Sequence, residues 1–399
     1  MEYLLIAFIG MLYVVYSLTI RQLELHEVTG PMFFVIGGFV LAWLMPYEEN
    51  HLTNSIDMVL PLVELTLSIF LFSDAAKSKL AVLKHSFQYP SLLLFIALPL
   101  TLLLGMGVAS LFFDELPIIS LGLLAVVLTP TDAALSKDLF ASKDVPEKIR
   151  EGINTESGLN DGLCVPIFIL FLLFAHDANS VVSVSTILEV FGRELGIAIA
   201  LAMVSVAIFV PALNFAMQRH YFANNTSPFL LIGFVMVLFS LTQYLQGSGF
   251  IAVFVAGLLF DRFCNDQLRH KLVRDSEYLA DFVSLLIWFV FGSVFVYLIF
   301  PRVDYLIVLY GLLSATLIRI VPVMLSLQFT TLNLKERFTF AWFGPRGLAS
   351  IVFTLMIIEA DIAYKYEIAT ITMTTILCSV FIHGISTRPL TNSFKSKNK

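Results

Sequence analysis

The stretch Asn154-Thr155-Glu156-Ser157-Gly158-Leu159-Asn160-Asp161 runs directly into an apolar segment at residues 162–175. It therefore places two carboxylates, an amide and a hydroxyl inside or at the edge of a predicted membrane helix. Such groups are costly in hydrocarbon, so each needs a partner or a function. Glu156 and Asn160 are i,i+4 neighbours on one helix face, and Ser157 and Asp161 are i,i+4 neighbours about 100° away. One face can form a structural ion pair while the other offers oxygen ligands to a small cation.

The composition indicates a polytopic membrane protein. Of 399 residues, 58% are hydrophobic and 14% are charged, which is more apolar surface than a soluble domain of this length can bury. Cys164, Cys264 and Cys378 are too few and too scattered for a disulfide framework or a metal site, so we expect buried thiols. Because the N-terminus lacks a basic region and a cleavage site, we expect a retained first helix.

Apolar runs of about 17–25 residues can cross a bilayer as helices. The sequence predicts about thirteen of them, at roughly 3–20, 29–45, 57–73, 88–113, 116–140, 154–176, 186–217, 228–244, 248–262, 279–300, 303–326, 337–359 and 367–386. No stretch between them is long enough for a soluble domain. The expected fold is therefore an all-α polytopic membrane protein.

The positions of the basic residues predict its orientation. With the N-terminus outside, 19 of the 24 Lys and Arg residues fall in cytoplasmic connections and the C-terminal tail. Two fall in outer loops (Arg302 and Lys365) and three within spans (Arg193, Arg319 and Arg346). This strong excess of positive charge on one side predicts an outer N-terminus and a cytoplasmic C-terminus.

Two predicted spans contain helix breakers. Thr129-Pro130-Thr131-Asp132 interrupts the fifth span, and Gly344-Pro345-Arg346-Gly347 interrupts the twelfth. The spans are seven helices apart, hence antiparallel, which indicates an inverted repeat with its site at the breaks. In such a crossing, Asp132 can offset the positive N-terminal ends of half-helices and Arg346 the negative C-terminal ends. A proline kink would explain Pro130 alone, but it would not explain a breaker with a charge of opposite sign in each span.

Asp161 lies near the middle of the predicted membrane, where one carboxylate can hold a proton or a dehydrated Na⁺, but not both comfortably. Small hard cations prefer several oxygen ligands. The Ser157 hydroxyl, the Asp132 carboxylate and the Thr131 carbonyl freed by Pro130 can complete a cage around Na⁺. Competition between the two ions at one carboxylate is sufficient for exchange.

Together these residues resemble the NhaP-type branch of the monovalent cation/proton antiporters, which also contains the eukaryotic sodium/proton exchangers. The resemblance rests on thirteen spans, Thr131-Asp132 in a broken fifth span, Glu156-Ser157 followed by Asn160-Asp161, Arg319 in the eleventh span, and the Gly-x-Arg-Gly break. His383-Gly384 also matches the family's ending, whereas Pro345 stands where many relatives have another residue. The resemblance supports Asp161, Asp132, Ser157 and Thr131 as the cation and proton ligands.

The resemblance also implies an architecture. A transport core of spans 4–6 and 11–13 would move like an elevator against a dimerisation domain, in a homodimer in the plasma membrane. The expected segments are 1–86 and 225–300 for dimerisation, 87–178 and 301–390 for the core, 179–224 for the linking seventh span, and 391–399 for a short cytoplasmic tail. The implied partners are membrane lipid and small inorganic cations, with no cofactor and no nucleic acid.

Four further residues are considered as supports of the site. Glu156 lies roughly 6 Å from the start of the sixth span and Arg319 roughly 10 Å from the inner end of the eleventh. Because neither charge is tolerable alone at that depth, we expect a structural pair, which the family also shows. Asn160 cannot titrate, and relatives with Asn-Asp are generally electroneutral, so we expect one proton per cation. Asp74 is placed either at the cytoplasmic funnel or at an ordinary solvated helix end.

The sequence leaves three function classes: cation/proton antiport, sodium-coupled symport and intramembrane catalysis. Antiport of Na⁺, and also Li⁺, against protons is strongly favoured. A K⁺/H⁺ antiporter of the same architecture is the nearest alternative. A sodium-coupled solute symporter is less favoured and would need a larger polar cavity. An intramembrane enzyme is least favoured, because the sequence has neither a Gly-x-Ser-x-Gly nor a His-Glu-x-x-His motif. Glu64, in the middle of the third span, has no predicted partner and is interpreted as a structural group or a cavity residue.

Overall fold

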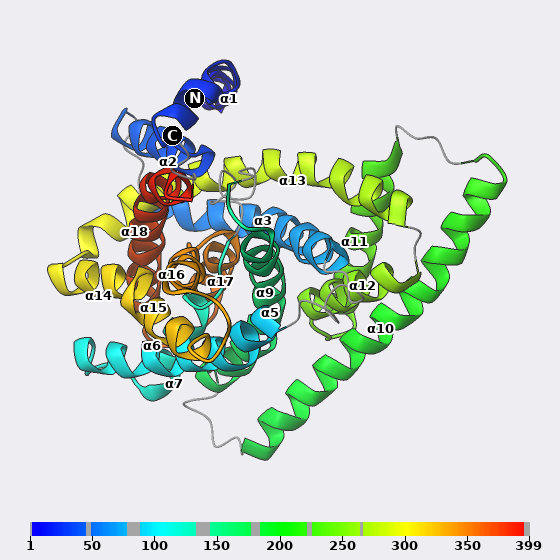
Figure 1. The fold of residues 1–399 in the computed structure, drawn as a ribbon. Coiled ribbons are helices and arrows are strands. Elements are labelled where there is room, and N and C mark those ends of the chain that lie inside the picture. Colours follow the sequence, from blue (N-terminus) through cyan, green and yellow to red (C-terminus); the bar gives the residue numbers. More distant parts are fainter. Residues whose placement is uncertain are drawn as a thin grey trace, which may run out of the picture.

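The computed structural model describes residues 2–44, 49–77, 88–132, 144–176, 184–221, 226–263 and 266–394, and within these ranges it contains helices and connections but no strand. The expected all-helical fold is confirmed (Figure 1). In chain order the helical elements are α1 (Glu2–Leu25), α2 (Gly30–Leu44), α3 (Glu49–Lys77), α5 (Gln88–Leu92), η1 (Leu93–Ala97), α6 (Leu98–Phe112), α7 (Ile118–Val127), α9 (Glu147–His176), α10 (Val184–Gln218), α11 (Ser227–Tyr244), α12 (Gly249–Phe263), α13 (Asp266–Val294), η5 (Phe295–Ile299), η6 (Phe300–Arg302), α14 (Tyr305–Ala315), α15 (Leu317–Ser326), α16 (Leu334–Trp342), α17 (Leu348–Glu359) and α18 (Lys365–Asn392).

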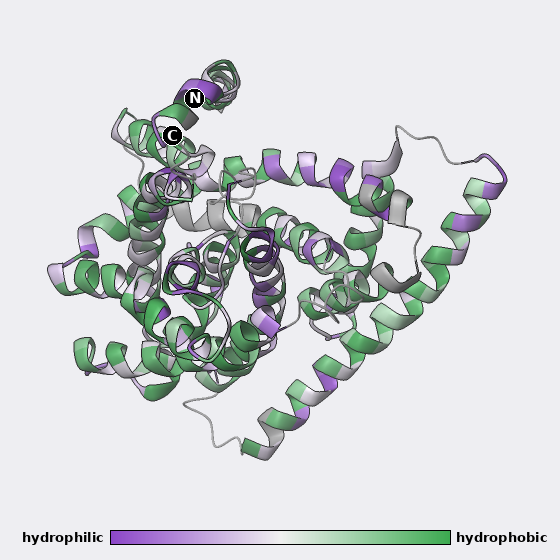
Figure 2. Ribbon diagram, in the orientation of Figure 1, coloured by the Kyte–Doolittle hydropathy of each residue, from purple (hydrophilic) through white to green (hydrophobic). Residues whose placement is uncertain are grey.

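The helices are suited to a membrane in length and in composition. In the described ranges, eight helical segments are long and apolar enough to cross a bilayer, and further apolar helices such as α2, α7 and α17 are shorter. Figure 2 shows hydrophobic residues along the outer helices of the molecule. Leu18 on α1 is 81% exposed and Leu111 on α6 is 82% exposed. Because lipid solvates such side chains, the surface agrees with a polytopic membrane protein.

Both predicted helix breaks are present. In the fifth predicted span, α7 ends at Val127 and the chain is non-helical from residue 128 to 132. The half-helix expected after this break falls in residues 133–143, outside the described part of the chain. In the twelfth predicted span, α16 ends at Trp342 and α17 begins at Leu348, so residues 343–347 form the second break.

A third break lies in the eleventh predicted span and was not expected. Helix α14 ends at Ala315 and α15 begins at Leu317, while Thr316 between them has φ −123° and ψ −91°. Neither Gly nor Pro marks this position in the sequence, and Pro322 lies within α15. The break leaves carbonyl groups at the end of α14 without helical partners, and one of them contributes to the site described below.

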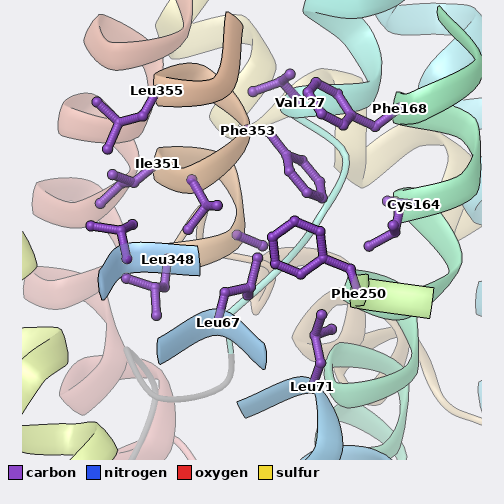
Figure 3. Close-up of a cluster of buried hydrophobic side chains, with 14 of the residues drawn as sticks. Leu67, Leu71, Val127, Cys164, Phe168, Phe250, Leu348, Ile351, Phe353 and Leu355 are labelled. Carbon is purple, nitrogen blue, oxygen red and sulfur yellow. The ribbon is translucent and has the colours of Figure 1, made fainter. Parts of the chain in front are cut away.

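The helices pack in two groups that meet at α3 and α9. In one group α13 packs against α2 and α3, and α12 packs against α3 and α10; in the other, α14 and α17 pack against α18, and α6 and α9 pack against α7. Figure 3 shows the apolar contact between the groups, where Leu67 of α3, Phe168 of α9, Phe250 of α12 and Phe353 of α17 converge. The rings of Phe168 and Phe353 stack with centroids 4.4 Å apart.

The cysteines follow the expectation only in part. Cys164 is a buried free thiol on α9, as predicted. Cys378 on α18 is also free but only half-buried, which corrects the expectation of full burial. Cys264 lies outside the described residues.

Glycines allow α2 and α13 to approach at backbone contact. A Cβ added to Gly38 would overlap the Phe289 carbonyl, and a Cβ added to Gly292 would overlap the Val35 carbonyl. Ser293 and Tyr297 of the same segment donate hydrogen bonds to α2 carbonyls. Small residues at helix crossings are the usual basis of close packing in membranes, where lipid offers no hydrophobic drive for association.

We expect Gly292→Ala to lower the unfolding temperature of the purified protein. The new methyl group must push α2 and α13 apart, and overpacking of this kind costs about 1–3 kcal/mol. Gly107→Ala on α6 is the matched control, because its Cβ would have nothing within 4 Å. The control should unfold at the wild-type temperature or above, since Ala favours helix. Thermal unfolding in detergent measures both variants. If Gly292→Ala unfolds at the wild-type temperature, backbone contact between α2 and α13 is contradicted.

Candidate cation and proton site

The two breaks cross each other and are joined by one backbone–backbone hydrogen bond and by bonds from backbone groups to side chains. The Asp132 N–H donates to the Pro345 carbonyl at 2.8 Å, and the Ser350 hydroxyl donates to the Val127 carbonyl at 2.7 Å. The first N–H of α17, on Leu348, donates to Asp132 Oδ2 at 3.3 Å. The Asp132 carboxylate therefore lies at a helix N-terminus, where the helix dipole favours negative charge. Gly347 must lack a side chain, because a Cβ there would overlap Asp132.

Arg346 holds the C-terminal ends of two helices. Its guanidinium donates from Nη1 to the Thr129 carbonyl at 3.0 Å and from Nη2 to the Ser314 carbonyl at 3.1 Å. Thr129 follows the end of α7 and Ser314 belongs to the last turn of α14, so both carbonyls lack helical partners. The Arg346 side chain is fully buried. A positive charge thus lies where two negative dipole ends meet, in the place that the sequence suggested for it.

Asp161 contributes an unsatisfied oxygen to this crossing. Its carboxyl group accepts a hydrogen bond from the Thr131 backbone N–H, but its buried Oδ1 atom has no hydrogen-bond partner among the described residues. Ser157, one turn earlier on α9, donates its hydroxyl hydrogen to the Thr131 carbonyl, and both residues are buried. Asp132 lies within electrostatic range of Asp161. Of the four predicted ligands, Asp161 and Ser157 on α9 therefore both contact Thr131 in the fifth span's break, and Asp132 is related to Asp161 by electrostatics alone.

The donors at this crossing are carboxylate, hydroxyl and carbonyl oxygens. Oxygen donors of this kind suit hard cations, whereas the softer transition metals favour nitrogen and sulfur ligands. Within the described ranges no group of three or more His, Cys, Asp or Glu residues is arranged to hold a metal ion. The arrangement can therefore offer a transported cation two carboxylates together with neutral oxygens.

Asn160 joins the α9 helix to the fifth span's break. Its Nδ2 lies 3.3 Å from Glu156 Oε1, 3.3 Å from Thr131 Oγ1 and 3.4 Å from the Thr129 carbonyl. Its Oδ1 accepts a hydrogen bond from the Cys164 thiol at 3.2 Å. Cys164 was not predicted to belong to the site, although it lies four residues after Asn160 and hence on the same helix face. The amide orientation is thereby fixed, with its nitrogen toward three acceptors.

Glu156 and Arg319 form a buried bidentate pair. Arg319 donates from Nη1 to Glu156 Oε1 at 3.1 Å and from Nη2 to Oε2 at 3.0 Å. Glu156 is 2% exposed and Arg319 is 4% exposed, so neither charge is solvated. Arg319 lies in the first turn of α15, directly after the unexpected break at Thr316, and its guanidinium packs against Gly344 at the twelfth span's break.

Asp74 and Glu64, two of the acidic residues of α3, are placed differently. Asp74 lies against α9, where a Cβ on Gly158 would be 2.9 Å from the Asp74 Cβ, and it is within electrostatic range of Asp161. Lys77 approaches Asp74 at 4.0 Å and forms an ion pair with Glu277 of α13. Glu64, in contrast, is half-buried and lies within electrostatic range of Glu359 at the end of α17, away from these contacts. Asp74 therefore neighbours the site and Glu64 does not.

Known proteins share this fold and sequence pattern. "Probable Na(+)/H(+) antiporter 2" of Methanocaldococcus jannaschii is 26% identical over 395 residues, which cover 90% of this chain and 89% of the relative. "Na(+)/H(+) antiporter NhaH" of Halobacillus dabanensis is 23% identical over 296 residues, covering 71% of each chain. "K(+)/H(+) antiporter NhaP2" of Shewanella baltica is 22% identical over 272 residues, covering 66% of this chain but 45% of that longer relative.

Solved structures and a family model give the same result. The structure of the sodium proton antiporter MjNhaP1 from Methanocaldococcus jannaschii at pH 8 superposes with a TM-score of 0.74 at 20% identity, covering 98% of this chain and 97% of that one, which shows a common fold. The family model described as "Sodium/hydrogen exchanger, transmembrane" matches residues 4–393. The chain therefore belongs to the transmembrane sodium/hydrogen exchanger family.

Proposed function

We propose that this chain exchanges Na⁺, and also Li⁺, for protons by competition of the two ions at Asp161. The observation that carries the proposal is the buried Asp161 Oδ1 atom, which has no hydrogen-bond partner in the described residues. A buried carboxylate oxygen without a partner is costly. A bound proton removes the charge, and a bound cation neutralises it, so either ion relieves the cost and each excludes the other.

The ligands of the cation are Asp161, Asp132, the Ser157 hydroxyl and the Thr131 carbonyl. Ser157 already contacts the Thr131 carbonyl, and the Thr131 backbone contacts Asp161, so three ligands are adjacent before an ion enters. Asp132 adds a second carboxylate, held at the N-terminus of α17. Small hard cations prefer several oxygens of this kind.

Asp161 alone changes its proton occupancy in the cycle. Asp132 stays compensated by the N-terminus of α17, and Glu156 stays compensated by Arg319. Asn160 has no titratable group, although it occupies the position next to Asp161. Exchange is therefore electroneutral, with one proton for one cation, and the Glu156–Arg319 pair has a structural role.

We propose that alternating access uses the two helix groups. The core comprises residues 87–178 and 301–390, and it moves like an elevator against a dimerisation domain of residues 1–86 and 225–300 in a homodimer. The segment 179–224 links the two, and 391–399 is a short cytoplasmic tail. Support comes from the packing, because α7, α9, α14, α17 and α18 contact one another, whereas α2, α3, α12 and α13 form the second group.

The chain lies in the plasma membrane with its N-terminus outside and its C-terminus in the cytoplasm. Arg388 near the end of α18 donates to the Leu25 carbonyl at the end of α1, so these two helix ends lie on the same side of the molecule. The N-terminus of α1 is then on the opposite side. The excess of Lys and Arg in the connections on the Arg388 side makes that side cytoplasmic.

K⁺/H⁺ exchange is the second candidate, because one of the relatives is named a K⁺/H⁺ antiporter. The two candidates use the same residues and differ in the size of the oxygen cage. Proton flux in proteoliposomes, with Na⁺, Li⁺ and K⁺ offered in turn, decides between them. The proposed function requires flux with Na⁺ and with Li⁺, and flux with K⁺ alone would replace it by the second candidate.

Asp161→Asn and Asp132→Asn are each expected to abolish cation-driven proton movement in proteoliposomes while the protein stays folded. The first removes the titrating group, and the second removes a charged ligand from the cation. Asp361→Asn, an exposed carboxylate after α17, is the matched control and should transport at the wild-type rate. Retention of more than a small fraction of the rate by Asp161→Asn would rule out exchange at this carboxylate.

Glu156→Gln and Arg319→Ala should each destabilise the protein, because each leaves a buried charge without its partner at a cost of about 3–5 kcal/mol. Changing both residues to apolar ones should recover part of the loss. Arg274→Ala, which breaks a more exposed pair with Asp275, should cost about 0–1 kcal/mol. Thermal unfolding measures all four. If the single variants unfold at the wild-type temperature and only transport is lost, the structural role is wrong.

Exchange should be unaffected by an imposed membrane potential and should generate none, since one charge moves in each direction. The rate should be bell-shaped in pH, because protons compete with the cation at low pH and are too scarce for the return step at high pH. Proteoliposomes with a potassium gradient and an ionophore test the first point. A transport current, or a reversal condition that shifts with voltage, would demand a second titrating group, with Asp132 or Glu64 the first to examine.

A further inference from the structure

His383 and Ser379, one turn apart on α18, both contact the break in the twelfth predicted span. His383 Nε2 lies 3.0 Å from the Trp342 carbonyl, at the last residue of α16. The Arg346 N–H, four residues further along the chain, donates to Ser379 Oγ at 2.8 Å. His383 and Ser379 are both fully buried. Helix α18 thus supplies partners on either side of the break.

Both ring nitrogens of His383 face carbonyl oxygens. Nδ1 lies 2.8 Å from the Ser379 carbonyl and Nε2 lies 3.0 Å from the Trp342 carbonyl. A carbonyl can only accept, so a neutral ring donates to one of the two. With the proton on Nε2, the ring donates to Trp342, and Nδ1 can accept from the Ser379 hydroxyl 3.1 Å away. In that tautomer, with the Ser379 oxygen accepting from the Arg346 N–H, a continuous chain of hydrogen bonds runs from Trp342 through His383 and Ser379 to the backbone of Arg346.

The groups held by this chain are those that shape the ion site. Trp342 and Arg346 are the ends of a segment whose Pro345 carbonyl accepts from the Asp132 N–H. The Arg346 side chain binds the Thr129 carbonyl, two residues before Thr131. A break that relaxed at either end would move Asp132 and the Thr131 carbonyl relative to Asp161. Transport sites tolerate little displacement of this kind, because ligand geometry sets ion affinity.

We propose that His383, with its proton on Nε2, is a positioning residue for cation binding that acts through Ser379 and the backbone of the twelfth span's break. It touches neither the cation nor a presumed ligand. Without its N–H, the carbonyl that ends α16 loses a buried hydrogen bond, and the break relaxes. The inference rests on the proposed antiport function, since its readout is the affinity for the transported cation.

The test compares cation-driven proton flux in proteoliposomes for four variants: His383→Phe, His383→Gln, Ser379→Ala and Ser386→Ala. His383→Phe removes the donor, whereas His383→Gln keeps an amide N–H that can reach the Trp342 carbonyl. Ser379→Ala removes the partner of the Arg346 N–H with a smaller change in volume. Ser386→Ala is the matched control, because Ser386 accepts from the Trp342 indole N–H at 2.8 Å and donates to the His383 carbonyl at 3.3 Å, and neither bond involves the His383 imidazole or the Trp342 carbonyl.

We expect the KM for Na⁺ to rise on the order of tenfold in His383→Phe and severalfold in Ser379→Ala, the size of effect that losing a buried hydrogen bond produces. His383→Gln and Ser386→Ala should keep a KM near that of wild type. Unfolding temperatures measured beside the flux separate positioning from folding. If His383→Phe fails to fold, Ser379→Ala carries the same expectation in a folded protein.

A wild-type KM in His383→Phe, or in a folded Ser379→Ala if His383→Phe does not fold, would overturn the inference. So would a rise in His383→Gln equal to that in His383→Phe, because a donor at Nε2 would then be irrelevant. Failure of the proposed function looks different: the wild-type protein itself would show no cation-driven flux.

Discussion

The ion site depends on two helix breaks whose exposed backbone groups are hydrogen-bonded within the protein, away from water. A broken helix in a membrane exposes carbonyls and N–H groups that lipid cannot solvate. Here the Asp132 carboxylate accepts from the first N–H of α17, and Arg346 donates to the carbonyls that end α7 and α14. Because these groups neutralise the breaks, the Thr131 backbone can remain non-helical at the crossing, where its N–H donates to Asp161 and its carbonyl accepts from Ser157.

Helix α9 then separates two tasks on two faces. On one face Glu156 meets Arg319 and Asn160, so both Glu156 carboxylate oxygens and the Asn160 amide nitrogen have hydrogen-bond partners, whereas the buried Arg319 Nε has none in the described residues. On the other face Asp161 keeps a buried oxygen without one. The hydrogen-bonded Glu156 carboxylate favours a fixed structure. The Asp161 oxygen without a partner favours a group whose ion occupancy changes. A single helix can hold both because residues four apart share a face and residues one apart do not.

The sequence was sufficient for much of this arrangement, because breakers and charges inside apolar runs are rare and therefore informative. Both crossing breaks, the opposite charges within them and the Glu156–Arg319 contact follow from that rule. The break at Thr316 could not be predicted, since neither Gly nor Pro marks it, and the Arg346 side chain that binds the nearby Ser314 carbonyl comes from a distant part of the sequence. The contributions of Cys164, Ser379 and His383 were also missed, because each depends on which helix faces which.

The most direct test of competition at one carboxylate is the number of protons released when the purified protein binds Na⁺. Calorimetric titration in buffers of different ionisation enthalpy gives this number at a pH where the site is protonated. The account predicts about one proton per Na⁺ for the wild type, with neither binding nor release in Asp161→Asn. Release of two protons, or continued proton-coupled binding without the Asp161 carboxylate, would contradict it.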